Sequence, residues 1–251
     1  MDVYLAEFLG TTILLLMGNG VVANVVLDKT KGRDGGWIVV SAGWALAVYT
    51  AVLCVGHVSG AHINPAVSIG LAAAGVFEWR LVPGYVTAQM LGGIVGGALV
   101  FVFYKSHYAV TKDADAKLAT FCTAPNLRAL PLNLFCEVVA TFVLVYAVLQ
   151  LPDSDPTFTL ASEGGGDKIQ VGLGSIGGVR VALIVFAIGL SLGGTTGYAI
   201  NPARDLGPRI AHAILPIPGK RDSDWSYAAI PVLGPVIGGL AAAALFVGLP
   251  S

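Results

Sequence analysis

The sequence predicts an all-α membrane protein with six transmembrane helices and two re-entrant half-helices in an inverted repeat. Three observations lead to this fold class: charged residues make up only 12% of the chain, six apolar stretches are long enough to cross a bilayer, and the tripeptide Asn-Pro-Ala occurs twice. Soluble domains contain about 25% charged residues. With half that share and 55% hydrophobic residues, the chain cannot cover a surface that faces water, which disfavours a soluble enzyme.

The charge balance disfavours a nucleic-acid-binding protein, and the N-terminus disfavours a cleaved signal peptide. The net charge of -1 comes without a dense basic block, so the chain lacks the electrostatic footprint of a nucleic-acid-binding protein. The first residues contain no basic region, and no obvious cleavage site follows the apolar run from Phe8 to Leu27. This run is long enough to span a membrane, and we interpret it as a permanent membrane helix rather than a signal peptide.

A spanning helix needs about 20 predominantly apolar residues. The six stretches that qualify are roughly 3 to 27, 37 to 56, 81 to 104, 132 to 151, 180 to 196 and 227 to 249. Two of them contain an acidic residue, Glu7 and Glu137, and each carboxylate should face protein or a polar cavity because charge is costly in lipid. Small residues spaced four apart predict close helix packing, at Gly92 and Gly96, Gly93 and Gly97, and Gly234 and Gly238.

Two further apolar stretches, about 64 to 74 and 201 to 214, are too short to cross a bilayer. At about 1.5 Å per residue, the first reaches about 16 Å, roughly half of a hydrocarbon core. The two stretches begin identically, with Asn64-Pro65-Ala66 and Asn201-Pro202-Ala203. Upstream of each stands the pattern Glu-x-x-small-Thr, beginning at Glu7 and at Glu137.

These matches divide a single domain of residues 1–251 into two repeats, about 1–106 and 130–251. Each repeat would hold three spanning helices and one half-helix. Because three is odd, the second repeat must enter the membrane upside down relative to the first. The polar segments 105–131 and 152–179 are expected to be connecting loops, the second of them flexible and exposed to solvent.

Each Asn-Pro-Ala is a helix start, because asparagine is a good N-cap and proline suits the next position. In an inverted pair the two starts meet near the midplane, where non-helical backbone is tolerated only if it lines a cavity. Each start carries the equivalent of about +0.5 charge. A neutral solute exchanges its water hydrogen bonds for polar groups there at little net cost, whereas an ion loses its hydration shell. The sequence thus predicts a pathway for neutral solutes that excludes ions and protons.

At these residues the chain resembles the major intrinsic protein family, the aquaporins and glycerol facilitators. The resemblance covers nearly the whole chain and is most specific in Ser59-Gly60-Ala61-His62-Ile63-Asn64-Pro65-Ala66-Val67 and Gly197-Tyr198-Ala199-Ile200-Asn201-Pro202-Ala203-Arg204-Asp205. It implies an aquaporin-like bundle with one pore per subunit, assembled as a homotetramer. It also implies that Asn64 and Asn201 donate hydrogen bonds to the permeating molecule. The carbonyl groups of Gly60, Ala61, His62, Gly197, Tyr198 and Ala199 would line the pore.

The resemblance places the narrowest point of the pore at Trp44, Gly189, Tyr198 and Arg204. Arg204 stands in the first turn of a half-helix, where a cation opposes the dipole, and this mismatch suggests a functional role. Water-selective members of the family resemble one another in having histidine at the position of Gly189. With glycine there, Trp44 and Tyr198 would form an apolar wall facing Arg204, which suits a polyol. Asp205, and similarly Arg209, are marks of the glycerol-conducting branch.

We therefore expect a passive, multi-pass channel, in the plasma membrane, for glycerol and other small neutral solutes such as water, urea or metalloid acids. No cofactor or metal is expected, because His57 and His62 lack a third ligand nearby. Two alternatives stay open: a water-selective channel, and a coupled secondary transporter in which Glu7 and Glu137 titrate. The orientation is open as well, because the positive-inside rule opposes the topology that the resemblance implies.

Overall fold

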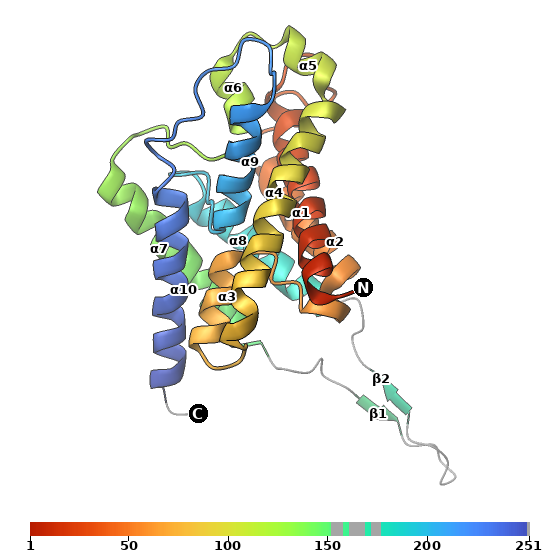
Figure 1. Ribbon diagram of the computed structural model, residues 1–251, viewed down its shortest axis with the longest axis vertical. Coiled ribbons are helices and arrows are strands. Elements are labelled where there is room, and N and C mark those ends of the chain that lie inside the picture. The colour runs from red at the N-terminus through yellow and green to blue at the C-terminus, as the bar shows by residue number, and fades with distance from the viewer. Residues whose placement is uncertain (152–157, 161–168, 172–176, 250–251) are drawn as a thin grey trace.

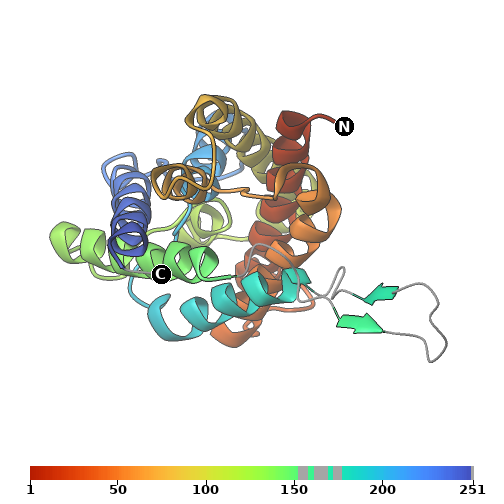
Figure 2. The same ribbon diagram turned by 90° about the horizontal axis from the view of Figure 1, so that it is seen from below.

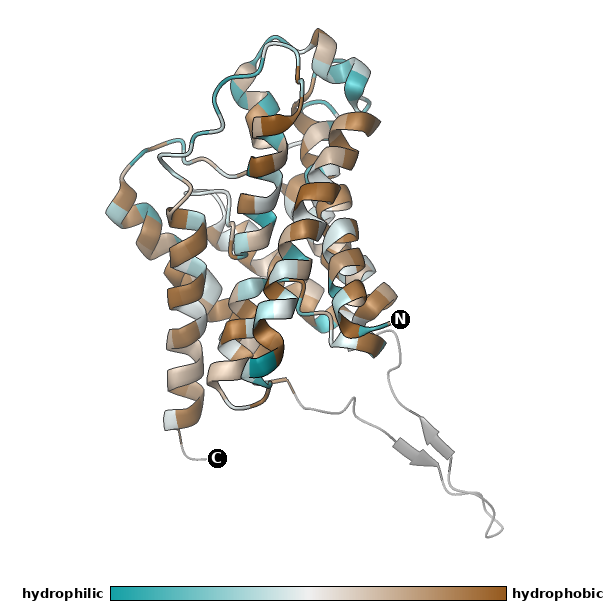
Figure 3. Ribbon diagram, viewed as in Figure 1, coloured by the Kyte–Doolittle hydropathy of each residue, from teal (hydrophilic) through white to brown (hydrophobic). Residues whose placement is uncertain are grey.

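The computed structural model describes residues 1–151, 158–160, 169–171 and 177–249, and it is a bundle of helices (Figure 1). Five helices are long and apolar enough to cross a membrane: α1 (Val3–Val26), α2 (Trp37–Ser59), α4 (Val82–Phe103, preceded by the 3-10 turn η1, Trp79–Leu81), α7 (Leu130–Leu149) and α10 (Ile230–Gly248). Hydrophilic residues gather mainly beyond the ends of these helices (Figure 3). The predicted membrane bundle is confirmed.

The sixth predicted span is shorter than expected. We expected a helix over 180 to 196, but α8 (Val179–Leu192) has 14 residues and so is about 21 Å long, less than the thickness of a hydrocarbon core. The helix ends where Gly193 and Gly194 open a turn that continues to Thr196. Glycine has a low helix propensity, and this turn leads the chain directly into the loop before the second half-helix.

The two polar segments are more ordered than the expected loops. Residues 105–131 contain α5 (Lys105–Val110) and α6 (Ala114–Ala119), and the side chain of Asp113 caps α6. Within 152–179 the structure has two short antiparallel strands, β1 (Phe158–Leu160) and β2 (Ile169–Val171), where we expected a flexible connection. The remainder of that expected loop, 152–157, 161–168 and 172–176, lies outside the described residues.

The half-helices are α3 (Pro65–Ala73) and α9 (Pro202–Ile214), and α4 holds α9 through glycine. A Cβ atom on Gly93 would lie 2.6 Å from the carbonyl oxygen of Ala203, and a Cβ on Gly92 would lie 2.5 Å from that of Phe8 in α1. Atoms cannot approach so closely, so both positions require glycine for this packing. The predicted small-residue pairs of α4 therefore serve two different neighbours, α1 and α9.

Helix α10 holds α3 in the corresponding way. A Cβ on Gly239 would lie 2.7 Å from the carbonyl oxygen of Ala66, and a Cβ on Gly238 would collide with that of Val138 in α7. The half-helix α9 thus packs on α4, which also packs on α1. The half-helix α3 packs on α10, which also packs on α7. The two views in Figures 1 and 2 show α3 and α9 arranged one above the other along the long axis of the bundle.

Candidate functional site

The two half-helices begin at the predicted asparagines. The Oδ1 atom of Asn64 accepts a hydrogen bond from the N–H of Ala66 at 2.9 Å. The Oδ1 atom of Asn201 accepts from Ala203 at 2.9 Å and from Arg204 at 3.1 Å. Proline follows each cap at the first helical position, so the local sequence accounts for both starts.

The same two asparagines join the halves to each other. The Nδ2 group of Asn64 donates to the carbonyl oxygen of Ile200 at 2.8 Å, and that of Asn201 donates to the carbonyl oxygen of Ile63 at 2.8 Å. The sequence did not predict this reciprocal link. Because an amide NH₂ group carries two hydrogens, each asparagine keeps one N–H for another acceptor.

A buried carboxylate holds the loop before α3. One oxygen of Glu7 accepts hydrogen bonds from Ser59 Oγ at 2.6 Å and the N–H of His62 at 3.0 Å. The other accepts from the N–H of Ile63 and from Gln89 Nε2, both at 2.7 Å. Every contact fixes the loop or its neighbour α4, so this carboxylate braces the backbone.

Glu137 makes the corresponding contacts before α9. One of its oxygens accepts from Thr196 Oγ1 at 2.6 Å and from the N–H of Ala199 at 3.0 Å. The other accepts from the N–H of Ile200 at 2.8 Å. Glu7 and Glu137 are both fully buried, and a buried carboxylate needs such donors because desolvation is costly.

The braced loops have an unusual backbone. Four residues that are not glycine have a positive φ: Ala61 (48°), Ile63 (43°), Tyr198 (37°) and Ile200 (44°). This conformation costs of order 1–3 kcal/mol per residue and persists only where the surroundings impose it. Within the described residues, no hydrogen bond is donated to the carbonyl oxygens of Gly60, Ala61, His62, Gly197, Tyr198 or Ala199. These six acceptors are the ones that the resemblance assigns to the pore.

A cavity of about 140 Å³ runs between these loops and the helices, several times the space that one water molecule needs. The polar part of the lining comes from the two loops, with Asn64, Asn201 and Arg204. The apolar part comes from α1, α2, α3, α7 and α8, with Leu14, Val48, Val52, Val67, Leu71, Leu144, Val148, Val181 and Val185. The cavity therefore offers both hydrogen-bonding groups and apolar surface for carbon-bound hydrogens.

Arg204 lies differently from the expectation. We expected its guanidinium to face an apolar wall formed by Trp44 and Tyr198 across the passage. Instead the guanidinium carbon lies 4.2 Å from the centroid of the Trp44 ring, and both side chains are buried. A cation over an indole face is attracted by the ring, more strongly when both are desolvated. Arg204 and Trp44 are thus in direct contact.

Trp37 is a residue of this region that the sequence did not reveal. It is half exposed at the end of α2, as for an interfacial tryptophan, but its Nε1 donates to the carbonyl oxygen of Gly189 at 2.8 Å. Its ring also packs edge-on against Tyr198, with centroids 5.7 Å apart. The spacing of seven from Trp44 was the available signal, because residues seven apart share a helix face.

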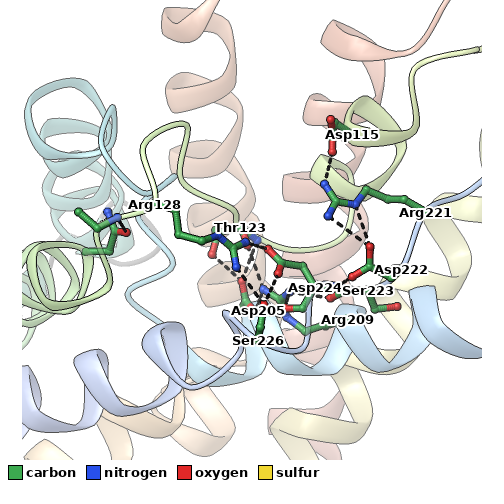
Figure 4. A network of polar contacts seen from close by, with 12 residues as sticks. Asp115, Thr123, Arg128, Asp205, Arg209, Arg221, Asp222, Ser223, Asp224 and Ser226 are labelled. Atoms are coloured by element: carbon green, nitrogen blue, oxygen red, sulfur yellow. Dashed lines mark hydrogen bonds and ion pairs between the residues drawn. The ribbon is translucent and has the colours of Figure 1, made fainter.

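A buried ion pair joins Arg209 to Asp205, the residue that follows Arg204 in α9 (Figure 4). The Nε and Nη2 atoms of Arg209 donate to Asp205 Oδ1 at 2.9 and 2.7 Å. The second carboxylate oxygen of Asp205 accepts from the N–H and Oγ1 of Thr123 at 2.7 and 2.6 Å. Arg209 also donates to the carbonyl oxygens of Ser223 and Asp224 at 2.8 and 3.0 Å. The pair therefore links α9 to segment 105–131 and to the segment between α9 and α10.

The network continues toward the surface. Arg128 pairs with Asp224, and Arg221 pairs with Asp115 and with Asp222, the latter at 3.2 Å. A hydrogen bond from the N–H of Asp224, together with Arg221, holds the pKa of the Asp222 carboxyl below its ordinary value. These contacts join α6 and residue 128 to the segment between α9 and α10 (Figures 1 and 4).

Comparisons with known proteins give matches over nearly the whole chain. The model of the family described as Major intrinsic protein matches residues 1–246. The chain is 55% identical over 246 residues to the probable glycerol uptake facilitator protein of Thermotoga maritima, covering 98% of both chains. It is 49% identical to glycerol uptake facilitator protein 3 of Lactiplantibacillus plantarum, over 98% of this chain and 96% of that one. The X-ray structure of the aquaglyceroporin from Plasmodium falciparum matches with a TM-score of 0.81 at 31% identity, over 98% and 95% of the two chains.

Proposed function

The chain belongs to the major intrinsic protein family and is an integral, multi-pass membrane protein, and from that premise we propose that it is a passive channel for glycerol and other small neutral solutes, with water. The cavity, with its polar loop groups and its apolar helix side chains, is the observation that carries the proposal. Glycerol has hydroxyl groups along one edge and carbon-bound hydrogens along the other. Its hydroxyls would contact the free carbonyl and amide groups of the loops, while its carbon skeleton would contact the valine and leucine side chains.

The same cavity accounts for the exclusion of ions. An ion must give up its hydration shell to enter a cavity with a largely apolar wall. Each half-helix start adds on the order of 1–2 kcal/mol against a cation about 6 Å away at an effective dielectric of about 20. Arg204 adds a full positive charge beside the passage. We infer that desolvation supplies most of the barrier and that these charges add to it.

Two alternatives are less well supported. A water-selective pore would need a side chain that narrows the passage at Gly189, and glycine has none. A coupled transporter would need a carboxylate that titrates during the cycle. Both oxygens of Glu7 and of Glu137 already accept hydrogen bonds from the loops, which favours a bracing role for each.

The finer features are part of the same proposal. Two inverted repeats form one channel domain, and four subunits assemble as a homotetramer in the plasma membrane. Urea and neutral metalloid acids are small enough to be further permeants. Asn64, Asn201 and the six free carbonyl groups bind the solute, and Trp44, Gly189, Tyr198 and Arg204 form the narrowest point.

The glycerol assignment is tested with the purified protein in liposomes. In an inward glycerol gradient the vesicles should shrink and then recover their volume far faster than empty vesicles, with a low activation energy. Light scattering in a stopped-flow instrument measures both phases. Recovery no faster than in empty vesicles would overturn the assignment, and dependence of the rate on a proton gradient would favour the transporter instead.

Removing the charge at the narrowest point should weaken ion exclusion. Arg204→Val is expected to admit protons or small cations more readily. Among the described residues, Arg204 is the one lysine or arginine that lines the cavity, and the substitution removes its positive charge. Glycerol flux should persist. Current under voltage clamp, with the wild type as reference, measures the leak. If the ion current of the variant equals that of the wild type, Arg204 has only a structural role.

A further inference from the structure

Two buried polar atoms around the narrowest point, Trp44 Nε1 and Arg204 Nη1, have no hydrogen-bond partner among the described residues. Two further buried atoms, Ser41 Oγ and Tyr198 OH, have no partner there other than each other. An unpaired buried polar atom costs about 1–3 kcal/mol, so a cluster of them marks a place where water or a ligand completes the bonding. Trp44, Tyr198 and Arg204 already belong to the proposed narrowest point, whereas Ser41 has no role so far.

Ser41 is fully buried in α2, one helical turn from Trp44, which lines the cavity. The two residues are three apart in α2 and therefore share a face. A Cβ atom added to Gly189 would lie 3.1 Å from Ser41 Oγ and 3.1 Å from Tyr198 OH. Both hydroxyl oxygens therefore lie against the position that a side chain at residue 189 would occupy, and Tyr198 also lines the cavity. Trp37 holds the Tyr198 ring in this position through its edge-on contact.

We propose that Ser41 and Tyr198 form a hydroxyl pair that binds one hydroxyl group of a permeating polyol, which makes Ser41 a specificity-determining residue of the channel. The inference rests on the proposed glycerol conduction. Trp44 Nε1 and Arg204 Nη1 can only donate hydrogen bonds, whereas a serine or tyrosine oxygen can also accept. The pair thus supplies the side-chain acceptors that a polyol hydroxyl needs for its own proton. A solute that lacks this hydroxyl leaves the pair unsatisfied.

The test compares two solutes that differ by one hydroxyl group. Glycerol and 1,2-propanediol have the same carbon skeleton, and their permeabilities are measured on the same proteoliposomes by stopped-flow light scattering. Ser41→Ala is expected to lower the ratio of glycerol to propanediol permeability by about threefold to tenfold, since a hydrogen bond contributes about 0.5–1.5 kcal/mol. Tyr198→Phe should lower the ratio in the same direction. The double variant should lower it by less than the product of the two, because both hydroxyls act on one group of the solute.

The matched control is Thr50→Val in the same helix. Thr50 is half exposed on the bundle surface, and its Oγ1 already donates to the carbonyl oxygen of Leu46 at 2.8 Å, so the ratio should stay at the wild-type value. Water permeability of each variant shows that the channel has assembled. If Ser41→Ala is not recovered as folded protein, Tyr198→Phe decides the question.

Two results would overturn the inference: a wild-type ratio in Ser41→Ala and Tyr198→Phe, or an equal fall in all solutes, which a merely structural role would produce. Wild-type vesicles without glycerol flux would instead overturn the proposed function. The two failures are therefore distinguishable.

Discussion

Gly189→His is expected to lower glycerol permeability by about fivefold or more, because forcing the solute past the added ring would raise the barrier by about 1–3 kcal/mol, the cost of overpacking, and each 1.4 kcal/mol is a factor of ten. Water permeability should fall much less. A Cβ atom at position 189 would already lie 3.0 Å from Tyr198 Cζ and 3.1 Å from Ser41 Oγ. The imidazole ring must therefore displace Tyr198, which lines the cavity, or extend into the passage beside it. Water is small enough to pass beside it, whereas a three-carbon chain is not.

The measurement is the ratio of glycerol to water permeability in the same vesicles. Gly194→His is the matched control, because a Cβ at this nearby position meets nothing within 4 Å. Gly189→Ala should give a smaller change in the same direction as Gly189→His. Equal loss of both permeabilities in Gly189→His would mean that the substitution disturbs the bundle, and that Gly189 is not at the narrowest point.

The parts of the fold that were predictable are those decided by local sequence. The starts of α3 and α9 follow from an asparagine cap followed by proline, which acts within a few residues. The spans follow from apolar length, which the lipid environment requires. The end of α8 was misplaced because an apolar stretch shows where a helix can continue, while Gly193 and Gly194 show where it stops.

The missed features depend on contacts between distant segments. Asn64 binds Ile200 across 136 positions in the chain, and Thr123 binds Asp205 across 82. No local pattern records either bond. The contact between Arg204 and Trp44 depends on which side-chain conformer the arginine adopts, which spacing along the chain does not determine. Sequence spacing selected the candidate residues of the site, and tertiary packing decides how they face one another.

Breaking the buried ion pair between Asp205 and Arg209 is expected to have the largest effect on the stability of the fold. Asp205→Ala should lower the free energy of unfolding by about 3–5 kcal/mol, because it leaves the fully buried charge of Arg209 without its counterion. It also removes the acceptor for both donors of Thr123. Thermal unfolding of the detergent-solubilised protein, followed by intrinsic fluorescence, measures the loss as a lower transition temperature.

Two companion variants separate the ion pair from a general effect of substitution. Asp115→Ala breaks the exposed pair with Arg221, and such surface pairs contribute at most about 1 kcal/mol. Asp205→Ala combined with Arg209→Met removes both buried charges, so it should recover much of the stability lost in the single variant. If Asp205→Ala is as stable as Asp115→Ala, the buried pair does not hold α9 to the connecting segments. Because Asp205 directly follows Arg204, that result would also mean that the position of Arg204 depends on its contact with Trp44 rather than on the network behind it.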